Sequence, residues 1–500
     1  MSQFALRHAV ATALVLSLLV ACGSRMVNPV SGRAERSVMD EQAEIAEGRK
    51  AHPQVLAEYG ALANLRLQAY VNEVGQKLAK QSHRAQLEWT FTVLDSPEIN
   101  AFALPGGYVY ITRGLMAFLD SEAELAGVLG HEIGHVTARH GAQRATRQQN
   151  AGLGVLAATV LGVLLESQGV GGATDVASQL GQGVAAGYVA TYSRDQETQA
   201  DQLGAEYLER NRYNPRNMID VIRVLKNHES FMAEQARAEG RSAAAGGSWL
   251  SSHPSNDQRL QDIQRVAAGY SGSYQDDGRA RYLQMLEGIA YGQSREQGVV
   301  RGRHFYHEDL GIALTAPQGW KLDNSPQSIT LVNAAGDAGL IVRLVPSSAG
   351  GTHEEIIRNL LKPTEGRSDQ RSLNGLPATH FIGARRDERG QVRAVRASVV
   401  SGPGQRHYLL QYASKDGAAL QRAAAQLQEA ESSFRALSAA EKAAARPWTL
   451  HMLPMPSGGF AELARRSPLS GAAEATLRLL NGAYGGTAEP RPGSQIKVVQ

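Results

Sequence analysis

The pentapeptide from His131 to His135 limits the structure of this chain more than any other segment does. It reads H-E-I-G-H, so two histidines four residues apart enclose a glutamate. Positions i and i+4 share one face of a helix, and both imidazoles can therefore bind the same metal ion. Glu132 then lies beside that metal, where a general base for water is required. The motif predicts a zinc hydrolase with one Zn²⁺ per chain.

The residues before the motif predict a helix. Ser121 and Glu124 have the spacing of a capping box, and an apolar run at helical spacing follows them. The members of this run are Leu125, Val128, Leu129, Ile133 and Val136. The alternative is an ordinary amphipathic helix with two surface histidines and an unrelated glutamate.

A second pair of residues supplies the remaining ligand. A catalytic zinc site has three protein ligands and one position for water. The only cysteine, Cys22, has another expected role, so the third ligand is His, Asp or Glu. Glu197 and Asp201 share a helix face, so Glu197 can bind zinc while Asp201 accepts the free N–H of a ligating histidine. The alternative is a solvated acidic helix face.

Four stretches of the chain carry a family resemblance. They are residues 96–107 (SPEINAFALPGG), the HEIGH motif with Val136 and His140, residues 193–201 (SRDQETQAD) and residues 252–255 (SHPS). Over residues 40–265 the chain resembles metallopeptidase family 48, the gluzincins that include the CAAX prenyl proteases and bacterial membrane-quality-control proteases. The resemblance implies a mainly helical metalloprotease domain with a small sheet. It also implies the zinc ligands His131, His135 and Glu197, with Glu132 as the general base.

Two further residues near these motifs have open roles. The family places the histidine of the His-Pro pair near the metal. This assigns His253 either as a catalytic donor to the tetrahedral oxyanion or as a fourth ligand that closes a latent site. His253 can equally be a helix N-terminal residue ahead of Pro254. Arg194 can orient an acidic partner or steer substrate, or it can pair with Glu197 or Asp201.

Residues 100–112 predict a hairpin that turns at the Pro-Gly-Gly triplet of residues 105–107. The alternating residues 90–93 predict a third strand beside it. In the family, the segment Asn100-Ala101-Phe102 resembles the edge strand that holds an extended substrate by main-chain pairing. A purely structural hairpin is the alternative.

The N-terminus has the pattern of a lipoprotein signal peptide. Residues 1–21 carry an early Arg7 and an apolar run too short to span a membrane, and they end in Leu-Val-Ala before Cys22. This end resembles a lipobox, which implies that a lipidated Cys22 is the mature N-terminus. A polar tether over residues 22–39 and an outer-membrane location facing the periplasm follow from it. An unlipidated secretory signal is the alternative.

The pattern changes to short strands after the metallopeptidase domain, which is predicted over residues 40–290. Residues 301–438 predict an α+β domain that weakly resembles the PsbP-like fold. Residues 446–500 resemble a LysM-like module that lacks the opening Gly-Asp-Thr. The fold class is therefore α+β. Inside the peptidase domain, residues 153–165 predict a buried or membrane-skimming helix, and residues 169–187 predict a loose cover over the cleft.

The numbers of basic and acidic residues indicate which classes of partner the sequence predicts. With 51 Lys and Arg against 48 Asp and Glu and no basic run, nothing predicts a nucleic-acid partner. The resemblance implies a lipid-anchored periplasmic zinc metalloendopeptidase that cleaves polypeptides, namely misfolded or stalled outer-membrane proteins. Two alternatives stay open. One is a chaperone or assembly scaffold with latent proteolysis, and the other is an adaptor whose LysM-like tail binds peptidoglycan.

Overall fold

The computed structural model describes residues 24–144, 146, 192–238, 253, 257–386, 390–469 and 471–500. The chain divides into two compact units. The first contains the chain up to Leu56 with Ala61–Ile289 and Leu450–Gln500, and the second contains Ala57–Gly60 and Ala290–Thr449. The predictions for the signal peptide, for Cys22 and for residues 153–165 and 169–187 lie outside the described residues. Within the described ranges, no helix is both long enough and apolar enough to cross a membrane.

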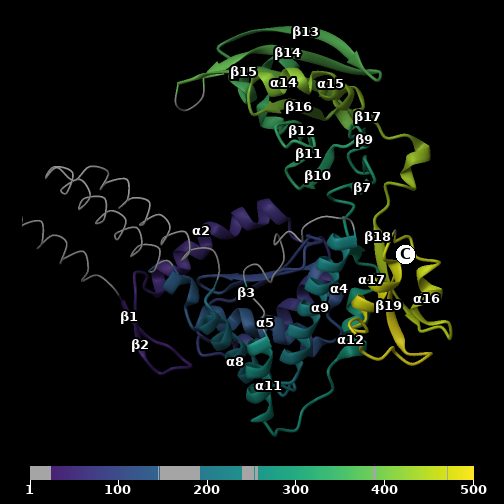
Figure 1. The fold of residues 1–500 in the computed structure, drawn as a ribbon. Coiled ribbons are helices and arrows are strands. Elements are labelled where there is room, and N and C mark those ends of the chain that lie inside the picture. The colour runs from purple at the N-terminus through teal and green to yellow at the C-terminus, as the bar shows by residue number, and fades with distance from the viewer. Residues whose placement is uncertain are drawn as a thin grey trace, which may run out of the picture. The chain divides into compact units, whose positions relative to one another are not determined.

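The first unit holds a group of helices around α5 (Glu122–Thr137) (Figure 1). Every residue of α5 is buried, and α3 (Leu65–Ala79), α8 (Arg194–Arg210) and α9 (Asn217–Ala238) pack against it. The other described helices of this unit are α2 (Glu41–Tyr59), α4 (Arg113–Phe118), α11 (Asp257–Ala268), α12 (Arg279–Leu286), α16 (Gly459–Ala464) and α17 (Ala473–Leu480).

The first turn of α5 differs in detail from the predicted capping box. Ser121 accepts from the N–H of Glu124 at 3.1 Å, as expected for an N-cap. The Glu124 carboxylate, however, accepts from the N–H of Asp120 at 2.7 Å and not from that of Ser121. The box is therefore half formed.

Two glycines of α5 allow a close contact with α8. A Cβ at Gly134 would lie 3.0 Å from the Ala200 carbonyl oxygen, and one at Gly130 would lie 3.3 Å from the Cα of Gly204. Larger residues at these positions would push the two helices apart. The glycines thus let the histidines of α5 and the carboxylates of α8 approach each other.

A three-stranded sheet contacts α3 and α5. Its strand β3 (Thr90–Leu94) runs parallel to β5 (Tyr108–Thr112), and β5 pairs antiparallel with β4 (Ala101–Leu104). The order β3-β5-β4 leaves β4 at an edge. The turn between β4 and β5 contains Gly106 and Gly107 with φ of 83° and 102°, a conformation that glycine adopts without strain. The predicted hairpin and its third strand are confirmed.

The residues after the predicted lipidation site form a hairpin and not a polar tether. β1 (Ser24–Val27) pairs antiparallel with β2 (Ala34–Ser37). Asn28 closes the connection, because its Oδ1 accepts from the N–H groups of Val30 and Ser31 at 2.9 and 3.0 Å. Its side chain is buried. The tether prediction is wrong for these strands because their polar groups find partners inside the unit.

Residues 450–500 belong to the same compact unit as the peptidase residues. In this segment β18 (Trp448–Pro454) pairs antiparallel with β19 (Gln495–Val499). The side chain of Lys497 is fully buried and donates to the Leu119 carbonyl at 2.7 Å. The region with LysM-like sequence therefore packs into the first unit and is not a separate body.

The second unit is built on a seven-stranded antiparallel sheet with the order β10-β11-β12-β16-β15-β14-β13. α14 (Gly417–Arg422) and α15 (Ala424–Ser432) lie on one face (Figure 1), and α13 (His353–Ile356) with the π-helical turn Ile357–Leu361 packs on the other. Helices and antiparallel strands together confirm the predicted α+β class.

The described strands of the second unit are β6 (Ala290–Tyr291), β7 (Val299–Arg301), β8 (His304–His307), β9 (Ile312–Thr315), β10 (Lys321–Ser325), β11 (Ser328–Val332), β12 (Ala338–Leu344), β13 (Glu365–Leu373), β14 (Leu376–Arg386), β15 (Val392–Ser401), β16 (His407–Ser414) and β17 (Arg435–Ala436).

Candidate metal centre

Helices α5 and α8 together supply three possible ligands of a metal. His131, His135 and Glu197 are 0%, 2% and 1% exposed. The Nε2 atoms of the two histidines lie 3.0 Å apart, and carboxylate oxygens of Glu197 lie 3.5 Å from the first and 3.4 Å from the second. Because both histidines are buried and face the carboxylate, the alternative of surface histidines on an amphipathic helix is excluded.

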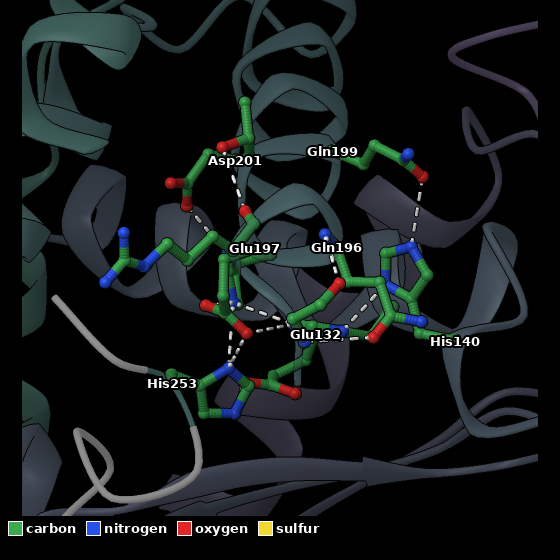
Figure 2. A network of polar contacts seen from close by, with 12 residues as sticks. Glu132, His140, Gln196, Glu197, Gln199, Asp201 and His253 are labelled. Atoms are coloured by element: carbon green, nitrogen blue, oxygen red, sulfur yellow. Dashed lines mark hydrogen bonds and ion pairs between the residues drawn. The ribbon is translucent and has the colours of Figure 1, made fainter. Parts of the chain in front are cut away.

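His253 joins this group from outside both helices. Its Nδ1 lies 3.3 Å from His131 Nε2 and 2.9 Å from Glu197 Oε1, and Figure 2 shows it pointing toward Glu197. One ligand atom from each of the four residues lies within 4.8 Å of the other three. Tetrahedral zinc, with bonds of about 2.0 Å, separates its ligand atoms by about 3.3 Å. The spacings of 2.9 to 3.5 Å and the mixed nitrogen and oxygen ligands fit zinc.

Burial and neighbouring charges set the protonation of these ligands. Burial lowers the pKa of His131 and lowers that of His135 to about 4, so both imidazoles are neutral near neutral pH and able to bind a metal. Burial alone would raise the pKa of Glu197, but His253 and Arg259 hold it well below its ordinary value. The group therefore offers two neutral imidazoles and an ionised carboxylate.

Asp201 holds the ring of His131. Its Oδ1 lies 2.9 Å from His131 Nδ1, so this nitrogen donates its proton to the carboxylate and Nε2 faces the metal position. The structure thus places Asp201 where the sequence predicts it. Burial alone would raise the pKa of Asp201, but Arg259 and His131 lower it below its ordinary value.

The arginine that contacts the α8 carboxylates is Arg259 and not Arg194. Arg259 donates to Asp201 through two bonds of 2.5 and 2.8 Å, and its Nη1 lies 2.8 Å from Glu197 Oε2. Arg194 begins α8 with an exposed side chain, and the described residues show no ion pair between it and either carboxylate. Sequence reasoning misses Arg259 because an arginine on an amphipathic helix such as α11 usually faces solvent.

His135 has outer partners of its own. Its Nδ1 lies 2.9 Å from Nδ1 of His140, and Nε2 of His140 lies 3.2 Å from Gln199 Oε1 (Figure 2). His140 is fully buried. The family motif includes His140 without giving it a role. Gln199 lies on α8 between the predicted site residues Glu197 and Asp201, and no sequence pattern marks it as a site residue.

Glu132 is buried beside the ligands, and its Oε1 lies 3.7 Å from His253 Nε2. Burial alone would lower the pKa of His253, but the carboxylates of Glu197 and Glu132 raise it above its ordinary value. The centre therefore combines a carboxylate able to take up a proton with an imidazole able to donate one.

The edge strand β4 ends close to the metal ligands. A small cavity of about 20 Å³ is lined by residues 103–105 at the end of this strand, and by His135 and Tyr192. The Tyr192 ring lies over the ring of His135, with their centroids 4.0 Å apart at an angle of 30°. The predicted substrate segment Asn100-Ala101-Phe102 leads into and overlaps this strand. Tyr192 is a site residue that the sequence motifs do not identify.

The sequence of residues 65–267 matches Peptidase family M48. The chain is similar to the beta-barrel assembly-enhancing protease of Escherichia coli (strain K12), with 26% identity over 280 residues that cover 54% of this chain and 55% of that protein. The protein of the same name from Yersinia pestis is 28% identical over 205 residues, which cover 40% of this chain and 39% of that protein.

A mitochondrial relative and a solved structure are also similar. The mitochondrial metalloendopeptidase OMA1 of Schizosaccharomyces pombe is 27% identical over 242 residues, which cover 47% of this chain and 64% of that protein. The chain thus spans less than two thirds of the length of these curated relatives. The solution structure of cyanobacterial PsbP from Synechocystis sp. PCC 6803 aligns with 28% of this chain and 98% of its own, at 15% identity and a TM-score of 0.20.

Proposed function

We propose that this chain, whose residues 65–267 match Peptidase family M48, is a lipid-anchored zinc metalloendopeptidase of the periplasm that cleaves misfolded or stalled outer-membrane proteins. The observation that carries this proposal is the buried group of His131, His135 and Glu197, whose spacing fits zinc. The substrate class is supported by the name shared by the Escherichia coli and Yersinia pestis relatives, beta-barrel assembly-enhancing protease.

The side chains around the metal position support hydrolysis of a peptide bond. Zinc, when bound, supplies a Lewis acid that polarises the carbonyl and acidifies water. Glu132 accepts the proton of the attacking water, and its carboxyl group then returns this proton to the leaving amine. Burial keeps His131 and His135 neutral, and Asp201 and His140 hold their outer nitrogens.

His253 has two supported roles in this site. Its 2.9 Å contact with Glu197 puts it where a fourth ligand lies, and four protein ligands are typical of a closed site. Once displaced from that position, its imidazole is able to donate to the oxyanion. This arrangement favours a resting site closed by His253 and an active site in which it serves as the donor.

We assign β4 as the strand that holds the substrate. It is an edge strand, and an extended peptide can pair with its outer side in the way that peptides add to exposed sheets. Its end lines the same cavity as His135, so a paired peptide would pass the metal position. The buried Oδ1 of Asn100 has no hydrogen-bond partner among the described residues and could accept from such a peptide.

The decisive variant is Glu132→Gln, which keeps the shape of the side chain but cannot accept a proton. We expect it to retain zinc and to lose cleavage of an unfolded outer-membrane β-barrel protein by about 10²- to 10⁴-fold. Glu429→Gln changes an exposed glutamate in the same way and should cleave at the parent rate. A Glu132→Gln protein that cleaves normally, or a His131→Ala protein that binds zinc normally, would contradict the proposal.

The second candidate is an assembly scaffold with latent proteolysis. The observation that favours it is the position of His253, which completes a closed set of four ligands. Complementation in cells distinguishes the two functions. If the Glu132→Gln protein supports outer-membrane assembly as well as the parent does, the scaffold function prevails.

The lipid anchor has its own test. Cys22→Ser removes the only cysteine of the chain and should move the protein from the membrane fraction to the soluble fraction. Retention of this variant in the membrane fraction would show that Cys22 is not the anchor.

A further inference from the structure

A chain of hydrogen bonds connects the N-terminal hairpin to the metal ligand His135. Asn28, at the turn of the hairpin, donates from Nδ2 to Gln199 Oε1 at 2.8 Å. The same oxygen lies 3.2 Å from Nε2 of His140, and Nδ1 of His140 lies 2.9 Å from His135 Nδ1. Asn28 and His140 are 2% and 0% exposed, so solvent does not compete for these bonds.

The chemistry of these groups fixes the direction of each proton. Gln199 Oε1 only accepts, so His140 must donate to it from Nε2. A neutral imidazole carries one proton, which leaves Nδ1 of His140 as the acceptor for Nδ1–H of His135. His135 then presents the lone pair of Nε2 to the metal position. If the Gln199 amide turned over, every proton would reverse and His135 would carry its proton on Nε2, where the metal binds.

Asn28 determines which way the Gln199 amide faces. Its Oδ1 is occupied by the N–H groups of Val30 and Ser31 in the turn. Its Nδ2 also donates to Glu35 Oε1 at 3.1 Å. The turn therefore holds the Oδ1 of Asn28, and Glu35 takes one hydrogen of its Nδ2. The second Nδ2 hydrogen faces Gln199. A donor at this place favours the oxygen of the Gln199 amide over its nitrogen.

We propose that Asn28 is a positioning residue for the zinc site, which sets the orientation of Gln199 and, through His140, the tautomer of His135. The proposal rests on the zinc site described above. His131 receives the equivalent support from Asp201, inside the helical group. His135 instead depends on a hairpin at the N-terminus, so full zinc affinity requires that the hairpin is docked.

The test is the zinc dissociation constant of the full-length chain, measured at neutral pH by competition with a chromophoric chelator. Asn28→Ala removes the donor and Gln199→Met removes the acceptor. Each should weaken zinc binding by about 10- to 100-fold, the range found for outer partners of metal ligands. Ser37→Ala is the matched control, since it removes hydrogen bonds to Met39 in the same hairpin, and it should leave the constant unchanged.

A rescue experiment separates positioning from a general need for the hairpin. In the double variant Asn28→Ala/Gln199→Glu, the carboxylate can only accept, so the proton directions are fixed without Asn28. We expect zinc affinity to return to the parent value. Melting temperatures of the metal-free proteins show whether each variant folds. If Asn28→Ala does not fold, the two single variants of Gln199 are compared instead. Gln199→Met should lose zinc affinity and Gln199→Glu should retain it.

Two results would overturn the proposal. One is an Asn28→Ala protein that binds zinc as tightly as Ser37→Ala does, and the other is a double variant that stays as weak as Asn28→Ala. A parent chain that binds no zinc is a different result, because it would remove the metal site itself and not only the contribution of Asn28.

Discussion

Arg259 is the buried cation on which the two carboxylates of α8 depend. It is 4% exposed and pairs with Asp201 and Glu197. Arg259→Met would remove the guanidinium that bonds to both buried carboxylates, which should lower the unfolding free energy of the metal-free protein by about 3–5 kcal/mol. Arg265→Met on the same helix breaks an exposed pair with Asp262 and should cost less than about 1 kcal/mol. Urea denaturation measures both, and equal losses would contradict the prediction.

Glu431 makes the stability of the second unit depend on pH. Burial alone would raise its pKa, but hydrogen bonds from His380, Ser398 and Tyr412 lower it from 4.5 to about 2. The pKa is lower in the folded chain than in the unfolded chain. The stabilisation is therefore present above pH 4.5 and is lost as the pH falls toward 2. A shift of this size corresponds to about 3 kcal/mol.

The variant Glu431→Gln cannot ionise and should remove this dependence. We expect its melting temperature to fall less steeply than that of the parent between pH 4.5 and 2, because the charged form no longer contributes. Glu429→Gln on the same helix should keep the parent profile, since its side chain is exposed. Identical profiles for Glu431→Gln and the parent would disprove this account.

The group of three buried candidate ligands could be predicted from the sequence, and most of its outer partners could not. His131, His135 and Glu197 lie in local patterns whose helical spacing determines which side chains share a face. The contact of Arg259 with His131 joins residues 128 positions apart, and no local pattern encodes such a distance. His140 lies in the motif, but only the fold shows that it bonds to a ligand.

The crossing of α5 and α8 is the element-level feature that brings the ligands together. Gly134→Ala would place a Cβ 3.0 Å from the rigid Ala200 carbonyl, so the helices must separate. We expect a loss of about 1–3 kcal/mol in unfolding free energy and weaker zinc binding. Gly127→Ala on the same helix meets the flexible thioether of Met218 at 3.2 Å and should be tolerated better. Comparable losses in both variants would show that the crossing is not the cause.

Element predictions failed where the sequence lacks an apolar pattern. β13 is an edge strand that is exposed along all but its last residue, so nothing in Glu365–Leu373 alternates between apolar and polar. β1 and β2 have four residues each, too few for an apolar alternation to be recognised, and the turn between them bonds to a distant segment through Asn28. β4 and β5 could be predicted because the Pro-Gly-Gly turn is a local signal.

At the scale of the whole molecule, the C-terminal segment is a structural part of the first unit. Deleting residues 450–500 would remove a set of buried apolar side chains and the buried Lys497. These apolar residues are Leu450, Leu477, Leu480, Ile496 and Val498. We expect the truncated chain to melt at a lower temperature than the parent, since each lost side chain leaves apolar surface exposed. An unchanged melting temperature in a thermal scan would show that the segment is an independent module.

The boundary of this unit could not be predicted from sequence. The LysM-like pattern of residues 446–500 is local and says nothing of the unit into which these residues pack. Membership of a compact unit depends instead on contacts across the chain, such as that between Lys497 and Leu119, which are 378 positions apart. The same holds for the second unit, whose seven strands pair in an order that differs from their order in the sequence.

The N-terminal hairpin would also set how far the folded chain could move from a membrane under the proposed lipid anchor at Cys22. Only Gly23 separates Cys22 from the first strand. An extended chain covers about 3.5 Å per residue, so a lipid on Cys22 would keep the folded unit within about 7 Å of its attachment point. A long flexible linker would instead let the folded unit sample a larger volume of the periplasm. Under the proposed anchor, this short connection would hold the folded unit at the membrane surface, where it would meet chains on the leaflet and miss those that diffuse freely.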